Sequence, residues 1–241
     1  MPELIRDSSH GNQISVIYLE DLEIFRKISR NGKGRQLLQA EHKGIHWYAG
    51  RSVSKPNPLN SEIWDTDLFT RLDIEKVSGV HIDYNASLET IFPYVEKCLD
   101  HYLELWPRKV TVPCHGDLTL DNVIFTDDAP IFFDWEHFSP EGECWGFDIA
   151  YLFLSALLLP SLGKLPANTS ERSYFINLWC RLRDVGLEER LYLDPVNYFS
   201  HAFNTGKHWE SIVKNSPRKL FPLWISDDVS KDLKIMIQEN S

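Results

Sequence analysis

One short stretch of the chain, His115 to Asn122, combines residue types and a spacing that suit phosphoryl transfer. It reads His-x-Asp-x4-Asn, and Asp134 follows twelve residues after the asparagine. In sites built on this pattern the aspartate accepts the proton of an attacking hydroxyl, while the asparagine and a later aspartate hold Mg²⁺ on the phosphates of a nucleotide. The pattern therefore predicts three oxygen-bearing side chains that converge on one small site.

A β-hairpin is predicted directly after this motif. Two short apolar runs, 123–125 and 131–133, flank the turn-forming sequence Asp-Asp-Ala-Pro. Such a hairpin places Asn122 just before its first strand and Asp134 just after its second, so the two side chains meet. The alternative is that the aspartates only cap turns, which is the usual role of an isolated aspartate. The predicted hairpin, with Asp134 at its end, favours a phosphoryl-transfer site over this alternative.

The segment from Cys114 to Leu152 resembles the aminoglycoside phosphotransferase and choline kinase group, relatives of protein kinases that phosphorylate hydroxyls of small molecules. The matching sequences are CHGDLTLDNVIF, IFFDWEHF and GFDIAYL. The resemblance places Asp117 and His115 in the catalytic set, with Asp117 as the base and His115 as a support of the loop. It implies that Asn122 and Asp134 bind Mg²⁺.

The resemblance also implies an α+β, two-lobe protein-kinase-like fold, with a small antiparallel β lobe and a mostly helical second lobe. Residues 1–76 are expected to form the nucleotide clamp, and residues 77–241 the catalytic and acceptor-binding lobe. Asp148, at a helix start, is expected to brace the catalytic loop, although a plain helix cap gives the same sequence. Strands are expected at 13–19, 22–29 and 69–74, and helices at 35–43, 86–106, 149–159, 171–185, 195–215 and 227–239.

The second predicted strand carries the candidate nucleotide contacts. Phe25 and Lys27 share one face of it, so Phe25 can lie on adenine while Lys27 reaches the α and β phosphates. Arg26 is the rival cation, because the choline kinase branch uses an arginine there. Glu41, on the helix that Gly44 is expected to end, is the expected partner of Lys27, with an ordinary exposed glutamate as the alternative.

Two further nucleotide contacts follow from position alone. Backbone groups around Glu75 and Val77 are expected to meet the adenine edge, as the hinge between the lobes. The phosphate loop is expected at 8–12, where Gly11 is the sole glycine and the Gly-x-Gly-x-x-Gly pattern is missing.

His42 and His46 have the spacing of a metal pair, but Gly44 between them and the lack of a third ligand favour a helix end over a zinc site.

Composition limits the partners and the location. The net charge of −10 repels nucleic-acid phosphates. The four cysteines are scattered without a Cys-x-x-Cys pair, which argues against a zinc site or a disulfide framework. The chain has no signal-like amino terminus and no apolar run long enough to span a bilayer, so the cytoplasm is the expected location.

Spacing predicts a small acceptor. Only fourteen residues separate Asp134 from Asp148, too few for an activation loop with a platform for peptides. The acidic residues nearby, Asp121, Glu136, Glu141 and Glu143, favour a neutral or cationic hydroxyl acceptor, such as a sugar, an aminoglycoside or an amino alcohol. The alternative is that Glu141 and Glu143 are ordinary solvated loop residues. ATP or GTP with Mg²⁺ is the expected donor. A nucleotide-binding pseudokinase, and a protein or lipid kinase, remain as alternatives.

Overall fold

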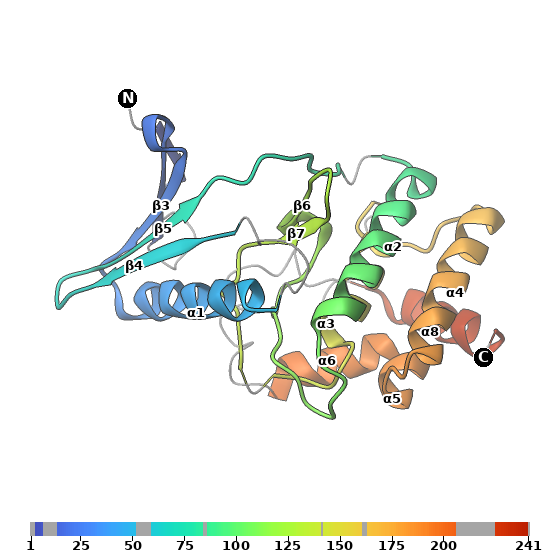
Figure 1. Ribbon diagram of the computed structural model, residues 1–241. Coiled ribbons are helices and arrows are strands. Elements are labelled where there is room, and N and C mark those ends of the chain that lie inside the picture. Colours follow the sequence, from blue (N-terminus) through green and yellow to red (C-terminus); the bar gives the residue numbers. More distant parts are fainter. Residues whose placement is uncertain are drawn as a thin grey trace.

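The computed structural model describes residues 3–6, 14–51, 59–83, 86–140, 142–160, 163–205 and 225–240. A five-stranded antiparallel sheet with the order β1-β2-β3-β5-β4 makes up the first lobe (Figure 1). Its strands are β1 (Glu3–Arg6), β2 (Ile14–Leu19), β3 (Ile24–Ser29), β4 (Ser61–Asp65) and β5 (Thr70–Glu75). Helix α1 (Gly32–Ala49) packs against β3, β4 and β5.

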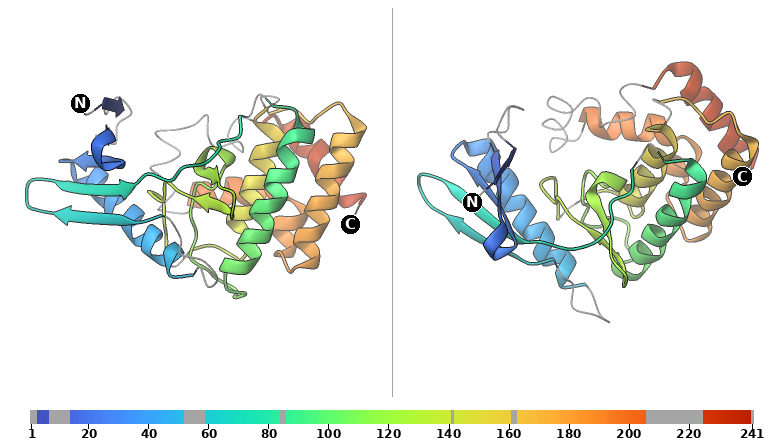
Figure 2. Two further views of the ribbon diagram at one scale, coloured as in Figure 1. Left: turned by 45° about the horizontal axis from the view of Figure 1, so that its top comes forward. Right: turned by 90° about the horizontal axis from the view of Figure 1, so that it is seen from above.

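The second lobe is mostly helical. Its elements are α2 (Leu88–Leu105), β6 (Val123–Phe125), β7 (Pro130–Phe132), α3 (Phe147–Leu158), α4 (Thr169–Asp184), α5 (Glu189–Leu193), α6 (Pro195–Thr205) and α8 (Asp227–Gln238). Every residue of α3 is buried, so this helix is the centre of the lobe. The β6–β7 hairpin lies between the sheet and α2 in each view (Figures 1 and 2). The predicted two-lobe α+β architecture is therefore confirmed, while the exact division at residue 76 stays a prediction.

Most of the expected elements are present near their expected bounds. The β2–β3 and β6–β7 hairpins form as predicted, and α2 runs without a break through Pro93. Residues 110–114 form only isolated bridges, Thr111 with Cys144 and Cys114 with Ser139, because Pro113 between them has no N–H to donate. The expected phosphate loop, residues 8–12, lies outside the described residues, as does the part of the 195–215 helix beyond Thr205.

Helix α1 differs most from its prediction. The helix begins at Gly32 rather than at the expected residue 35, and the Asn31 side chain accepts hydrogen bonds from the N–H groups of Lys33 and Gly34. The helix also continues through Gly44 to Ala49, so the expected end at Gly44 is wrong. The reason lies in the tertiary structure, because Gly44 is buried against Trp135 and Phe138.

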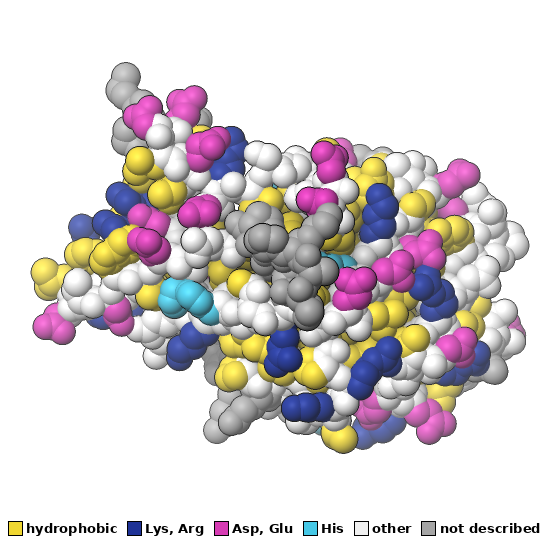
Figure 3. Space-filling model, in the orientation of Figure 1, with side chains coloured by type: hydrophobic (Ala, Val, Ile, Leu, Met, Phe, Trp, Pro, Cys, Tyr) yellow, Lys and Arg dark blue, Asp and Glu magenta, His cyan; other side chains and the backbone are white. Residues whose placement is uncertain are grey.

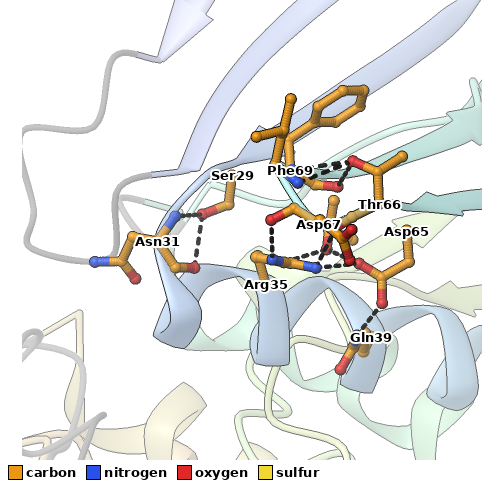
Figure 4. A network of polar contacts seen from close by, with 10 residues as sticks. Ser29, Asn31, Arg35, Gln39, Asp65, Thr66, Asp67 and Phe69 are labelled. Carbon is orange, nitrogen blue, oxygen red and sulfur yellow. Dashed lines mark hydrogen bonds and ion pairs between the residues drawn. The ribbon is translucent and has the colours of Figure 1, made fainter.

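A polar network fastens the first turns of α1 to the β4–β5 hairpin (Figure 4). Arg35 donates to the Asp65 carboxylate at 2.9 Å and to the Thr70 hydroxyl at 3.1 Å. Gln39, one turn later, donates to the other oxygen of Asp65. The network fixes the rotation of the helix, and that rotation turns Glu41 toward β3.

The surface gives two further observations. On the face drawn in Figure 3, the described acidic and basic side chains are interspersed rather than gathered in one basic patch. Among the described residues, no helix is both long and apolar enough to cross a membrane.

Candidate active site

The loop that carries the His-x-Asp motif is held by the start of α3. The Asp148 carboxylate accepts hydrogen bonds from the backbone N–H of His115 at 2.8 Å and of Gly116 at 3.0 Å. Burial raises the pKa of Asp148 to about 7, although these two hydrogen bonds lower it. Asp148 therefore makes the bracing contact that the sequence predicted, and the loop and α3 form one unit.

His115 is fully buried, and both of its ring nitrogens are engaged by the backbone. Its Nε2 donates to the carbonyl oxygen of Phe133 at 2.8 Å, and its Nδ1 accepts from the N–H of Asp117 at 3.3 Å. A ring with one donor and one acceptor nitrogen is neutral. Burial lowers the pKa of His115 to about 4, which agrees with this tautomer. The geometry favours a support of the loop over a proton carrier.

The hairpin brings Asn122 and Asp134 together. The backbone N–H of Phe133 donates to the carbonyl oxygen of Asn122 at 3.1 Å, which aligns the residue before β6 with the one that precedes Asp134. The Asn122 side-chain amide donates to the carbonyl oxygen of Asp117 at 2.6 Å. With its nitrogen held in this way, the amide oxygen is the atom that Asn122 offers to a cation. Asp134 has a left-handed backbone, with φ of 61°.

Lys27 lies between two carboxylates. Its Nζ is 2.7 Å from Glu41 Oε1 on α1 and 2.7 Å from Asp134 Oδ1. Burial disfavours the ammonium, but Asp134, Glu41 and Glu136 outweigh that effect and raise the pKa of Lys27. Lys27 is therefore charged at neutral pH.

Arg26, the rival cation, makes a bidentate pair with Asp73 on β5, at 2.8 and 2.6 Å. Because side chains alternate along a strand, Arg26 and Lys27 lie on opposite faces of the sheet. Only Lys27 of the two reaches Asp134.

The expected adenine contacts lie at the end of the sheet that joins the second lobe. Phe25 is half-buried and pairs with Tyr18 on β2, with ring centroids 5.0 Å apart. Glu75 ends β5, and its backbone N–H donates to the carbonyl oxygen of Asn60 at 3.1 Å. Val77 packs, partly buried, against the core. The N–H of Glu75 is therefore occupied within the protein, and the contact of Glu75 and Val77 with adenine stays a prediction.

The oxygen atoms of Asn122 and Asp134 suit a hard cation, for which the protein supplies only some of the ligands. Among the described residues, no three His, Cys, Asp or Glu side chains cluster as a metal site. Asn122 and Asp134 supply two oxygen donors. Mg²⁺ is commonly bound through one or two protein carboxylates, with waters and substrate phosphates completing its shell. The pair therefore fits Mg²⁺ carried by a nucleotide, whose phosphates would supply further oxygen ligands.

His137 is a residue of the site that the sequence did not reveal. Gly116 has φ of 91°, and a Cβ there would lie 2.5 Å from the carbonyl oxygen of His137. Burial lowers the pKa of His137, but Glu136, whose Oε1 is 3.4 Å from Nε2, together with Asp117 and Asp134, raises it overall. These carboxylates thus favour the protonated form of His137. The only sequence signal of this residue is its place next to Glu136.

The acidic residues that suggested a cationic acceptor are not equivalent in the structure. Glu136 is paired with His137. Glu143 lines a cavity of about 610 Å³ bounded by α5, α6 and α8, together with Glu188 and Tyr198. Asp121 is exposed, and Glu141 lies outside the described residues. Among the described residues of this group, Glu136 is the one that also acts on the pKa of Lys27.

A comparison with protein families finds a match over the part of the chain that carries the motif. Residues 85–141, which contain the motif and Asp134, match the phosphotransferase enzyme family, and this confirms the resemblance given by the motif. No curated protein matches the chain.

Solved structures similar to the chain include three kinases and phosphotransferases. A protein of Haemophilus somnus 129PT described as a fructosamine-3-kinase has 15% identity and a TM-score of 0.46, over 100% of this chain and 90% of that chain. Amicoumacin kinase hAmiN, in complex with AMP-PNP, Ca²⁺ and Ami, has 14% identity and a TM-score of 0.47, over 99% and 87%. The ternary complex of streptomycin, ATP and APH(2″)-IIa has 12% identity and a TM-score of 0.45, over 94% and 94%.

Proposed function

We propose that this chain, whose residues 85–141 match the phosphotransferase enzyme family, transfers the γ-phosphoryl group of ATP to a hydroxyl of a small molecule. The observation that carries the proposal is the position of Lys27. It contacts Glu41 and Asp134 at 2.7 Å each, and so joins the sheet, α1 and the end of the β6–β7 hairpin at one point. A charged lysine beside a carboxylate of this kind suits the phosphates of a nucleotide and its metal.

In this proposal each side chain has a separate task. Asp117 accepts the proton of the acceptor hydroxyl, while the backbone bonds from its loop to Asp148 keep it in place. Asn122 and Asp134 hold Mg²⁺, which neutralises charge on the β and γ phosphates. Lys27 binds phosphate oxygens, and Phe25, Glu75 and Val77 border the adenine. Since phosphoryl transfer needs little covalent help from the protein, positioning and charge neutralisation supply most of the rate.

The acceptor in this proposal is small and is neutral or cationic. The short segment from Asp134 to Asp148 is buried or half-buried at most of its described positions, and it contributes Glu136 to the site. The net charge of −10 favours the approach of a cation and opposes that of an anion. Sugars, aminoglycosides and amino alcohols satisfy these conditions.

An ATP-consumption screen tests the proposal. Purified protein is incubated with ATP or GTP, with and without Mg²⁺, and with a panel of aminoglycosides, amino alcohols and sugars. We expect Mg²⁺-dependent consumption that rises with at least one acceptor class. Binding of Mg·ATP without turnover on any acceptor would identify a pseudokinase instead, and transfer only to proteins or lipids in an extract would identify the other alternative.

A further inference from the structure

Gly44 lies where α1 meets the Asp-Trp-Glu segment. A Cβ at this position would lie 2.7 Å from the Cβ of Trp135 and 2.9 Å from the Cβ of Phe138. Both atoms are the first of their side chains and cannot swing away. A side chain at residue 44 would therefore force the helix and the segment apart.

The helix itself gives no reason for a glycine here. Gly44 is an interior residue of α1, where glycine is disfavoured because its backbone loses more freedom than that of alanine. Its φ is not in the left-handed region. Gly32, in the first turn of the same helix, has nothing within 4 Å of an added Cβ. The close approach to Trp135 is the feature that distinguishes the two positions.

Trp135 is a rigid surface for this contact. Its side chain is fully buried, and its Nε1 donates to the carbonyl oxygen of Phe132 at 2.8 Å. Its ring lies 5.2 Å from that of Tyr48 and 5.9 Å from that of Trp47, both on α1. The last turn of α1, after Gly44, thus packs on the residue that directly follows Asp134.

Helix α1 therefore makes two contacts with the segment formed by Asp134 and Trp135. Glu41 lies three residues before Gly44, on the same side of the helix, and meets Asp134 through Lys27. Gly44 meets Trp135, the neighbour of Asp134, without an intermediate. We propose that Gly44 is a positioning residue, which sets the distance between α1 and the metal-binding segment so that Lys27 can contact Glu41 and Asp134 together. The inference rests on the proposed function for its effect on the nucleotide.

The test compares Gly44→Ala with Gly32→Ala as a matched control. Both variants add one methyl group to α1, but only the first meets a neighbour. Binding of Mg·AMP-PNP is measured by calorimetry on samples whose circular dichroism matches the wild type. We expect Gly44→Ala to weaken binding about tenfold or more, because Asp134 and Lys27 no longer align, and Gly32→Ala to leave it unchanged.

A second measurement needs no nucleotide. Unfolding of wild type, Gly44→Ala, Glu41→Gln and the double variant gives a double-mutant cycle. We expect the effects to be non-additive, since a displaced helix already weakens the Glu41 contact. Additive effects, or a Gly44→Ala protein that is less stable but binds Mg·AMP-PNP as the wild type does, would leave Gly44 with a packing role only and overturn the proposal.

If Gly44→Ala does not fold, Trp135→Phe takes its place in both measurements, because it keeps the Cβ and removes part of the surface under α1. The same results are expected, and the same results would overturn the inference. Failure of the proposed function would look different, because wild-type protein would then not bind Mg·AMP-PNP while the cycle would still show coupling.

Discussion

Replacing His115 with glutamine removes a titrating group from the catalytic loop and keeps one of its two contacts. Glutamine Nε2 can still donate to the carbonyl oxygen of Phe133, whereas the N–H of Asp117 loses its acceptor. That loss is the same at every pH. The difference between the two proteins that changes with pH therefore reports the titration of His115 alone, because all other groups are shared.

The size of the effect follows from the shifted pKa. Burial lowers the pKa of His115 from 6.5 to about 4, so below pH 6.5 the unfolded chain binds a proton that the folded protein excludes. Stability from this group is complete above pH 6.5 and is lost as the pH falls toward 4. Between pH 7 and pH 5 the wild type should lose about 2 kcal/mol more of its unfolding free energy than His115→Gln does.

Urea unfolding followed by tryptophan fluorescence at pH 7, 6 and 5 measures this difference. A similar pH dependence in both proteins would show that His115 is not held as a neutral buried ring. The variant should also keep measurable phosphoryl transfer at pH 7. A loss of turnover as large as that of an Asp117 variant would refute the assignment of His115 to support of the loop.

Three other substitutions test separate contacts. Asp134→Ala should abolish transfer and weaken Mg²⁺-dependent ATP binding, and Asn122→Ala should have a smaller effect of the same kind. An unchanged affinity of Asp134→Ala for Mg·ATP in calorimetry would refute the metal assignment. Asp148→Ala leaves the N–H groups of His115 and Gly116 buried without their acceptor, so urea unfolding should show a loss of about 2–5 kcal/mol, and a loss below about 1 kcal/mol would exclude the bracing role. Glu136→Gln should raise the KM for a cationic acceptor more than it lowers kcat in steady-state assays, and an unchanged KM would remove Glu136 from acceptor binding.

Local sequence patterns predicted the parts of the fold that depend on neighbours along the chain. Alternation gave the β2–β3 hairpin, and helical spacing gave α2. The motif, with the hairpin after it, placed Asn122 and Asp134 together, whereas the contact of Asp148 with the loop was expected only from the family resemblance. The hairpins and α2 are encoded by short runs of consecutive residues, so they can be predicted without knowledge of the rest of the molecule.

The parts that were missed depend on distant contacts. The course of α1 through Gly44 is decided by Trp135, which lies about 90 residues further along the chain. Strand β4 is short and polar, and it pairs with β5. The guanidinium of Arg71 on β5 lies 3.6 Å from the ring centre of Trp64 on β4. His137 joins the site only because Gly116 lets its backbone approach. No local pattern encodes these three features.

We propose that this site moves a phosphoryl group with Asp117 as the base. The decisive measurement is phosphorus NMR of a reaction with ATP, Mg²⁺ and an acceptor found in the screen, run with wild type and with Asp117→Ala. We predict a new phosphate-ester signal on the acceptor with the wild type, and loss of most of that turnover in Asp117→Ala while its calorimetric affinity for Mg·ATP changes little. Transfer at the wild-type rate by Asp117→Ala would show that Asp117 is not the base, and no ester with any acceptor would show that the site does not phosphorylate these small molecules.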